Sequence, residues 1–303
     1  MVRYRKPVEP GRYVEDRRGT PGRRAVGIGA GGGGIAILIA IVVALLGGGS
    51  GLEDLGPMLE QLQAPAAEQP APAVTAAPED DMGTYMAAVM ADTDAMWASL
   101  FQQAGREYRP TKAILFTGFT DSGCGGADAR MGPHYCPLDE RVYLDLDFFD
   151  ELADRFGATG DFAAAYVMAH EVAHHVQNVL GLSEQVRAAQ QQEPSRANEF
   201  SIRLELQADC FAGVWASTIY TDATGSAEVQ EGYVEIDPGE IGEALEAAAA
   251  VGDDRIQIAV QGRVDPEAFN HGTAEQRVRW FNNGYESGDP GACDTFVQDA
   301  SAL

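Results

Sequence analysis

Outside its first 24 residues, the chain contains little positive charge. Those residues hold eight of its 21 lysines and arginines and three of its 46 acidic residues, so 13 basic and 43 acidic residues are left for the remainder. A body with a net charge of −30 repels the phosphates of DNA and RNA. We therefore expect no nucleic-acid partner.

The chain also has few cysteines, and none of them form a CxxC pair. A zinc site built from cysteines is therefore not expected. An even number of cysteines is typical of disulfides in an exported domain. Among the three ways of pairing them we favour Cys124 with Cys136 and Cys210 with Cys293. Four buried free thiols are the alternative.

Charge of either sign is missing from residues 25–46, which end in the apolar run IAILIAIVVALL. This stretch is long enough to span a bilayer as a helix, which needs about 20 residues. A cleaved signal peptide is the alternative, but the basic stretch ahead of it is long for one. We therefore expect a single-pass protein of the cell membrane with residues 25–46 as its transmembrane anchor. The basic segment 1–24 would be cytoplasmic and the acidic body extracytoplasmic.

Residues 47–81 are rich in glycine, proline and alanine, which predicts an extended linker before a folded domain at 82–303. Apolar periodicity and capping residues predict helices from about Met82, over 161–180 and 195–220, and from Asp237 and Thr273. Strands are predicted at 112–119 and 141–149. The second strand alternates apolar and polar residues, as a half-exposed edge strand that binds a peptide would. The fold class is α+β, helix-rich with a small N-terminal sheet.

Three of the five histidines lie within AYVMAHEVAHHVQNVLG, residues 165–181. HEVAH matches the H-E-x-x-H pattern, in which two histidines four apart lie about 40° apart on one helix face. His170 and His174 can therefore bind one Zn²⁺. Glu171 would lie beside the open coordination position, where it can take a proton from a zinc-bound water. His175 is rotated by about 100° from His174, so we exclude it as a ligand. It would pack in the core, support a ligand from behind or lie at the pocket rim.

A catalytic zinc site needs a third protein ligand, and LELQADCFAG (204–213) offers two acids four residues apart. Glu205 can complete a His₂Glu site with the fourth position left for water. Asp209 can then accept the far N–H of a ligand histidine. Asp145 and Asp147 are the competing acids, and we expect them to face solvent. Small residues on the same helix would let the two metal-binding helices approach closely: Ala208, Ala212, Gly213 and Ala216.

His271 opens the stretch HGTAEQRVRWF. Its ring can stabilise the oxyanion of a tetrahedral intermediate. A structural histidine with satisfied hydrogen bonds is the alternative. His134, which lies between two of the cysteines, is a weaker candidate.

Several long motifs resemble the bacterial putative neutral zinc metallopeptidase family: AYVMAHEVAHHVQ, RLELQADCFAGVWA, GPHYCPLDERVYLDLDFF and HGTAEQRVRWFNNGY. VEDRRG (14–19) resembles its N-terminal signature. That family is similar to the thermolysin-like gluzincins, in which ExxxD follows HExxH. The resemblance implies a zincin-like fold with His170, His174 and Glu205 as zinc ligands, Glu171 as catalytic base and Asp209 supporting a ligand histidine.

Together these features predict a membrane-anchored zinc metalloendopeptidase with one Zn²⁺ per chain. It would hydrolyse peptide bonds of a peptide or protein substrate outside the cytoplasm. A non-catalytic zinc-containing scaffold is one alternative, but structural zinc sites usually have four protein ligands. A zinc hydrolase of a non-protein amide is the other alternative, and the sequence does not separate it from a peptidase.

Overall fold

The computed structural model describes residues 3–4, 7–18, 81–128, 132–156, 161–219, 234–235 and 240–296. The chain divides into two compact units, one made of residues 1–20 with 75–303 and the other of residues 21–74. The second unit lies outside the described residues. So do the predicted anchor at 25–46 and the predicted linker up to residue 80.

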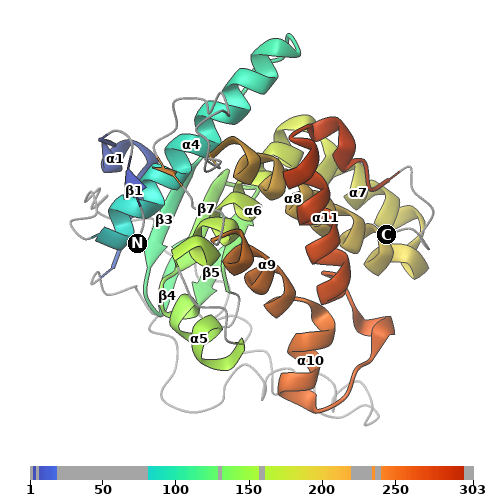
Figure 1. Ribbon diagram of the computed structural model, residues 1–303. Coiled ribbons are helices and arrows are strands. Elements are labelled where there is room, and N and C mark those ends of the chain that lie inside the picture. Colours follow the sequence, from blue (N-terminus) through green and yellow to red (C-terminus); the bar gives the residue numbers. More distant parts are fainter. Residues whose placement is uncertain are drawn as a thin grey trace, which may run out of the picture. The chain divides into compact units, whose positions relative to one another are not determined.

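The first unit combines short strands with longer helices (Figure 1). The described strands are β1 (Arg3–Tyr4), β2 (Val14–Asp16), β3 (Lys112–Phe116), β4 (Phe119–Ser122), β5 (Gly125–Asp128), β6 (His134–Cys136), β7 (Arg141–Asp145) and β8 (Val234–Glu235). The described helices are α1 (Pro10–Tyr13), α4 (Asp81–Gln103), α5 (Asp147–Phe156), α6 (Asp161–Leu180), α7 (Leu182–Gln192), α8 (Ala197–Ile219), α9 (Ile241–Ala250), α10 (Asp253–Gln261) and α11 (Ala274–Ser287). The predicted helix-rich α+β class is confirmed.

The largest described sheet has the strand order β2-β3-β7-β6. β2, β3 and β7 are parallel, and β6 runs antiparallel to β7 with His134 opposite Tyr143. The prediction that the 141–149 strand is a half-exposed edge is therefore wrong, because β7 is an inner strand. Its Tyr143 is buried in an apolar cluster with Ala127 from β5, so the face that alternation assigned to solvent is covered.

The same stretch is also a shorter strand than predicted, because α5 begins at Asp147. Asp145 ends β7 and is completely buried, against the expectation that it faces solvent. Its carboxylate accepts the backbone N–H groups of Gly118 and Asp147, at 3.2 and 3.1 Å. Asp145 therefore joins β7 to the start of α5. It is not one of the three residues whose potential ligand atoms converge, which are His170, His174 and Glu205.

The N-terminal segment is part of the folded domain. Val14 pairs with Ala113 of β3 and is 1% exposed. Glu15 accepts hydrogen bonds from Arg17 (2.7 Å) and from Arg141 at the start of β7 (3.0 Å). The domain boundary predicted at residue 82 therefore leaves out an edge strand of the main sheet.

This pairing shows that the predicted membrane topology is wrong. A chain that crossed a bilayer once between residues 16 and 112 would place β2 and β3 on opposite sides, whereas they are hydrogen-bonded neighbours. Within the described ranges, no helix is long and apolar enough to span a bilayer. The predicted single-pass protein with a cytoplasmic N-terminus and an extracytoplasmic catalytic domain is corrected accordingly.

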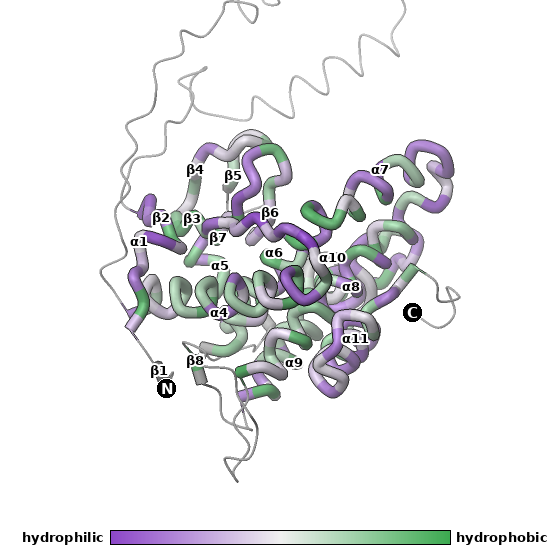
Figure 2. Tube along the Cα trace, turned by 90° about the horizontal axis from the view of Figure 1, so that it is seen from above, coloured by the Kyte–Doolittle hydropathy of each residue, from purple (hydrophilic) through white to green (hydrophobic). Residues whose placement is uncertain are grey.

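Helix α6 lies at the centre of the domain and packs against α4, α8 and α9 (Figure 1). All its residues from Phe162 to Ala173 are buried. It begins and ends where the sequence predicts, at residues 161 and 180. Helix α4, which packs against α6, is also largely apolar: Figure 2 shows mostly pale to green positions along it, as is typical of a core helix. Along α7, by contrast, purple and green positions alternate near the surface.

Helix α11 crosses α8 closely through two glycines. A Cβ atom at Gly284 would overlap the carbonyl oxygen of Cys210, and one at Gly213 would overlap that of Phe281. Gly213 therefore serves the contact between α8 and α11, not the contact between the metal-binding helices as expected. Gly284 lies inside α11, which continues to Ser287, and allows the close crossing with α8.

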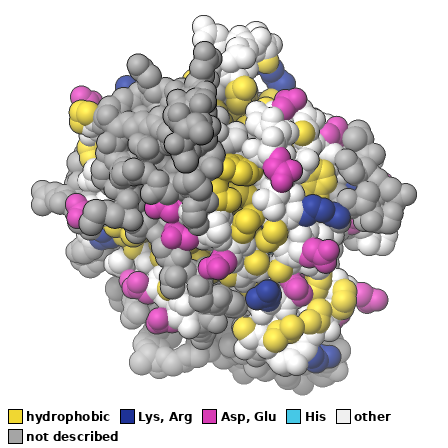
Figure 3. Space-filling model, in the orientation of Figure 1, with side chains coloured by type: hydrophobic (Ala, Val, Ile, Leu, Met, Phe, Trp, Pro, Cys, Tyr) yellow, Lys and Arg dark blue, Asp and Glu magenta, His cyan; other side chains and the backbone are white. Residues whose placement is uncertain are grey.

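Both disulfides form with the predicted pairing. Cys124–Cys136 joins the β4–β5 hairpin to β6, and Cys210–Cys293 joins α8 to a short 3₁₀ turn at Pro290–Cys293. The exposed surface is acidic, as the composition requires, and Figure 3 shows acidic side chains spread over the visible described face.

Candidate metal centre

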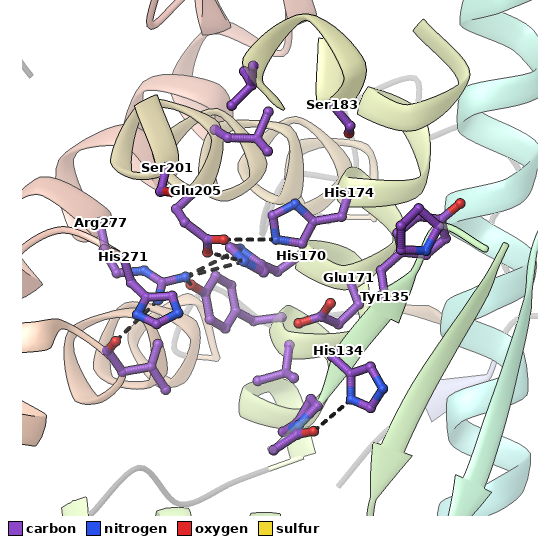
Figure 4. A pocket seen from close by; sticks show the side chains of 18 of the residues that line it. His134, Tyr135, His170, Glu171, His174, Ser183, Ser201, Glu205, His271 and Arg277 are labelled. Atoms are coloured by element: carbon purple, nitrogen blue, oxygen red, sulfur yellow. Dashed lines mark hydrogen bonds and ion pairs between the residues drawn. The ribbon is translucent and has the colours of Figure 1, made fainter. Parts of the chain in front are cut away.

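Helices α6 and α8 bring three potential metal ligands together (Figure 4). One ligand atom from each of His170, His174 and Glu205 lies within 4.8 Å of the others. Nε2 of His170 is 3.2 Å from Glu205 Oε2, and Nε2 of His174 is 3.4 Å from Glu205 Oε1. Two imidazoles and one carboxylate are a donor set that suits zinc. These three residues, which we call the metal cluster, are the ligands that the sequence predicts.

The far nitrogen of each histidine is held by a hydrogen bond. Nδ1 of His170 donates to Asp209 Oδ1 at 2.8 Å, and Nδ1 of His174 donates to Gln177 Oε1 at 2.9 Å. Bonds of this kind fix the tautomer and direct Nε2 toward the metal. The sequence predicted this role for Asp209 but did not identify Gln177, whose amide also donates to the Leu204 carbonyl of α8 at 2.8 Å.

The electrostatics of the cluster favour a cation. Burial alone would lower the pKa of His170, but the Asp209 and Glu205 carboxylates outweigh it and raise this pKa to about 9. Burial alone would raise the pKa of Glu205, but His174 and His170 hold it well below its usual range. Positive charge is thus stabilised where the three ligand atoms converge, so the residues present fit a divalent metal ion.

Asp209 is fixed by more than its histidine. Its carboxylate is 0% exposed and receives two hydrogen bonds from Arg277 of α11, at 2.8 and 2.9 Å, and one from Tyr166 at 2.5 Å. Burial raises the pKa of Asp209, but the charges of Arg277 and His170 outweigh burial and lower it. Asp209 therefore stays ionised in the core and can orient His170.

Glu171 lies next to the metal cluster and lines the same cavity as its ligands. It is 7% exposed, and its carboxylate makes no hydrogen bond with the part of the chain that the structure describes. Figure 4 places it between the ligand trio and His134 of β6. A carboxylate in this position is available to accept a proton from a reacting group.

His271 lies at the same cavity, in the loop before α11. Its Nδ1 donates to Asp253 Oδ1 at 3.0 Å. The other carboxylate oxygen of Asp253 accepts the backbone N–H groups of Asn270 and His271, both at 2.7 Å, and of Gly272 at 3.1 Å. This bonding raises the pKa of His271. The ring is 46% exposed and is oriented by a partner that the sequence did not reveal.

The cavity has a volume of about 590 Å³ and is formed by β6, α6, α7, α8 and α11 together with the loop that carries His271. Its apolar part includes Phe148, Val167, Val251 and Ile256. The metal cluster and Glu171 therefore lie in a cleft large enough for several side chains of a substrate.

Residues 2–296 match the family model described as "Putative neutral zinc metallopeptidase". The chain belongs to this family. It is 43% identical over 256 residues to "Uncharacterized protein YpfJ" of Escherichia coli (strain K12), with 84% of each chain covered. It is 46% identical over 207 residues to "Uncharacterized protein Rv2575" of Mycobacterium tuberculosis, with 67% of each chain covered. No solved structure matches the chain.

In this member of the zinc metallopeptidase family, His175, which directly follows the HEVAH motif, lies outside the metal cluster. Nε2 of His175 donates to the Arg109 carbonyl at 2.6 Å, and its Nδ1 accepts from the Tyr135 hydroxyl at 3.0 Å. Asn178 donates to the same hydroxyl at 3.1 Å. Burial lowers the pKa of His175 and keeps it neutral. His175 is 0% exposed and is not among the residues that line the cavity, so of the predicted alternatives it has the packing role, in which it attaches β6 to α6.

His134 also lines the cavity, from β6. Its ring stacks on Tyr143 with the centroids 5.2 Å apart, and its Nδ1 donates to the Gly132 carbonyl at 3.1 Å. These contacts account for its orientation without a ligand role.

Proposed function

We propose that the chain is a zinc endopeptidase that hydrolyses peptide bonds in a peptide or protein substrate. The proposal depends above all on one observation: three ligand groups converge beside an acid, Glu171, that has no hydrogen-bond partner among the described residues. Membership of the zinc metallopeptidase family supports the same chemistry.

His170, His174 and Glu205 would hold the zinc ion. Zinc bound there supplies a Lewis acid, which acidifies water and polarises a carbonyl group. We assign Glu171 as the base that takes a proton from the attacking water and delivers it to the leaving amine. We assign His271, oriented by Asp253, as a donor to the oxyanion that develops on the substrate carbonyl.

We assign β6 as the strand that holds an extended substrate, in place of the 141–149 strand that the sequence indicated. β6 pairs with β7 on one side and is an edge of its sheet. Its residues His134 and Tyr135 line the cavity of the metal cluster. An extended peptide can add to an exposed strand edge through backbone hydrogen bonds. The bond between Tyr135 and His175 would fix this edge relative to Glu171 on α6.

A scaffold that keeps zinc for structure alone is less consistent with this site. Structural zinc sites usually have four protein ligands, whereas three converge here among the described residues. A hydrolase of a non-protein amide would use the same groups, so the identity of the products must separate it from a peptidase.

The test uses the full chain, because β2 belongs to the domain. The zinc-loaded protein is incubated with an unfolded protein and with a peptide library, and new termini are identified by mass spectrometry. We expect internal cleavage that a chelator abolishes and added zinc restores. Zinc binding without cleavage of any peptide would overturn the proposal, and release of a non-peptide amide product would replace it with the other hydrolase.

A further inference from the structure

One wall of the cavity is formed by α7 and α8 and differs in character from the rest. On α7, Ser183, Val186, Arg187 and Gln190 line the cavity. Their spacing of three, four and seven residues places them on one helix face. On α8, Ser201 lies one turn before Glu205, which corresponds to about 6 Å along the helix. Because Glu205 belongs to the metal cluster, the wall lies directly beside that cluster.

The two helices are held together at this wall. Nε2 of Gln190 donates to Ser201 Oγ at 2.9 Å and to the Ala197 carbonyl at 3.1 Å. The hydroxyl of Ser201 is left to donate elsewhere, and the hydroxyl of Ser183 makes no hydrogen bond with the described part of the chain. Figure 4 places both serines on the far side of His174 and Glu205 from Glu171. The wall therefore presents two hydroxyl donors next to the metal cluster.

Arg187 supplies a free positive charge at the same wall. Within the described ranges its guanidinium group makes no hydrogen bond or ion pair, and the residue is exposed. Of the other cationic groups that line the cavity, Arg277 is bound to Asp209 and His271 to Asp253.

Among the described residues that line this wall, Glu205 is the only acid, although the chain as a whole has a net charge of −25. Among the described residues the only other acid that lines the cavity is Glu171, which belongs to the catalytic group. The acids visible in Figure 3 repel an acidic ligand at long range. That repulsion is largely screened beyond about 8 Å at physiological salt, whereas a contact pair inside a cleft is screened less.

We propose that the α7–α8 wall is a subsite for an acidic side chain of the substrate. Arg187 pairs with the aspartate or glutamate carboxylate, and the hydroxyls of Ser183 and Ser201 donate to it. This assignment rests on the proposed peptidase function and adds a substrate class to it: peptides with an acidic residue close to the scissile bond.

The test compares matched peptides that carry glutamate, glutamine or lysine at each position around one cleaved bond. For the wild type we expect kcat/KM about fivefold higher for glutamate than for glutamine at one position, as one partly exposed ion pair provides. Arg187→Gln should remove this preference. Arg187→Glu should reverse it in favour of lysine. Arg263→Glu is the matched control, because Arg263 is exposed and lies outside the cavity lining.

A binding measurement separates this inference from the proposed function. Dissociation constants for the glutamate, glutamine and lysine peptides are measured by fluorescence anisotropy on the zinc-loaded protein with Glu171→Gln, with and without Arg187→Glu. Tighter binding of the glutamate peptide that Arg187→Glu abolishes supports the subsite, even if the wild type cleaves nothing. Equal binding of the three peptides, or a preference that Arg187→Glu leaves unchanged, overturns it.

Discussion

Arg277→Met removes a charge on which a buried carboxylate depends. The Arg277 side chain is 4% exposed and that of Asp209 is 0% exposed, so neither can exchange its partner for water. Two hydrogen bonds of 2.8 and 2.9 Å join them, and a third links Arg277 to the Val251 carbonyl at 3.2 Å. Removal of one partner from a buried pair typically costs about 3–5 kcal/mol. We expect Arg277→Met to lower the free energy of unfolding by about 3 kcal/mol.

The assay is urea unfolding of the zinc-free full chain, followed by tryptophan fluorescence at neutral pH. Asp209→Asn in the Arg277→Met background removes the uncompensated carboxylate. The free energy of unfolding of the double variant should therefore fall by less than the sum of the losses measured for Arg277→Met and Asp209→Asn alone. Arg277→Lys keeps the charge without the two parallel bonds and should lie between wild type and Arg277→Met. A loss below about 1 kcal/mol for Arg277→Met, or strictly additive losses, would refute the reasoning.

The same variant has a predicted pH dependence. Because Arg277 and His170 lower the pKa of Asp209 in the folded chain, this carboxyl contributes stability above its unfolded pKa of about 4. That contribution is lost as the pH falls through the folded value. In Arg277→Met the opposing charge is gone, so the stability difference from wild type should shrink as the pH is lowered below about 4. An unchanged difference between neutral and acidic pH would contradict this assignment.

Further outcomes follow from single contacts. Gly284→Ala should lower Tm by about 5–10 °C, since its Cβ would overlap the backbone of α8, whereas Gly242→Ala in α9 meets open space and should not lower Tm. Asp253→Asn should lower the pKa of His271 toward 6.5 in an NMR titration, and no change would refute their pairing. Tyr135→Phe removes the hydroxyl that links β6 to His175 and Asn178 of α6, and it should raise KM about fivefold or more with a smaller change in kcat. A loss confined to kcat would contradict the positioning role of this hydroxyl.

The metal cluster could be predicted because its spacing is local. His170 and His174 are four residues apart on α6, and Glu205 and Asp209 are four apart on α8, so helix geometry alone places each pair on one face. The predicted limits of α6 were correct because the capping residue at its start and the glycine after its end are local signals too.

The supporting residues could not be predicted because their partners are distant in sequence. Arg277 is 68 residues from Asp209, and Asp253 is 18 from His271. No local pattern marks a buried arginine whose partner is on another helix. The prediction of the sheet was wrong for a related reason. β2 pairs with a strand about 100 residues later in the chain. Tyr143 is buried by the β4–β5 hairpin, whose position the alternation of apolar and polar residues cannot reveal.

The most direct test of the central claim measures zinc content and peptide cleavage on the same preparation of Glu171→Gln in the full chain. Glu171 is the proposed base and is not one of the three converging ligands. We predict about one zinc ion per chain, as in wild type, and a loss of cleavage of about 100-fold or more. Cleavage at near the wild-type rate with zinc retained would contradict the account.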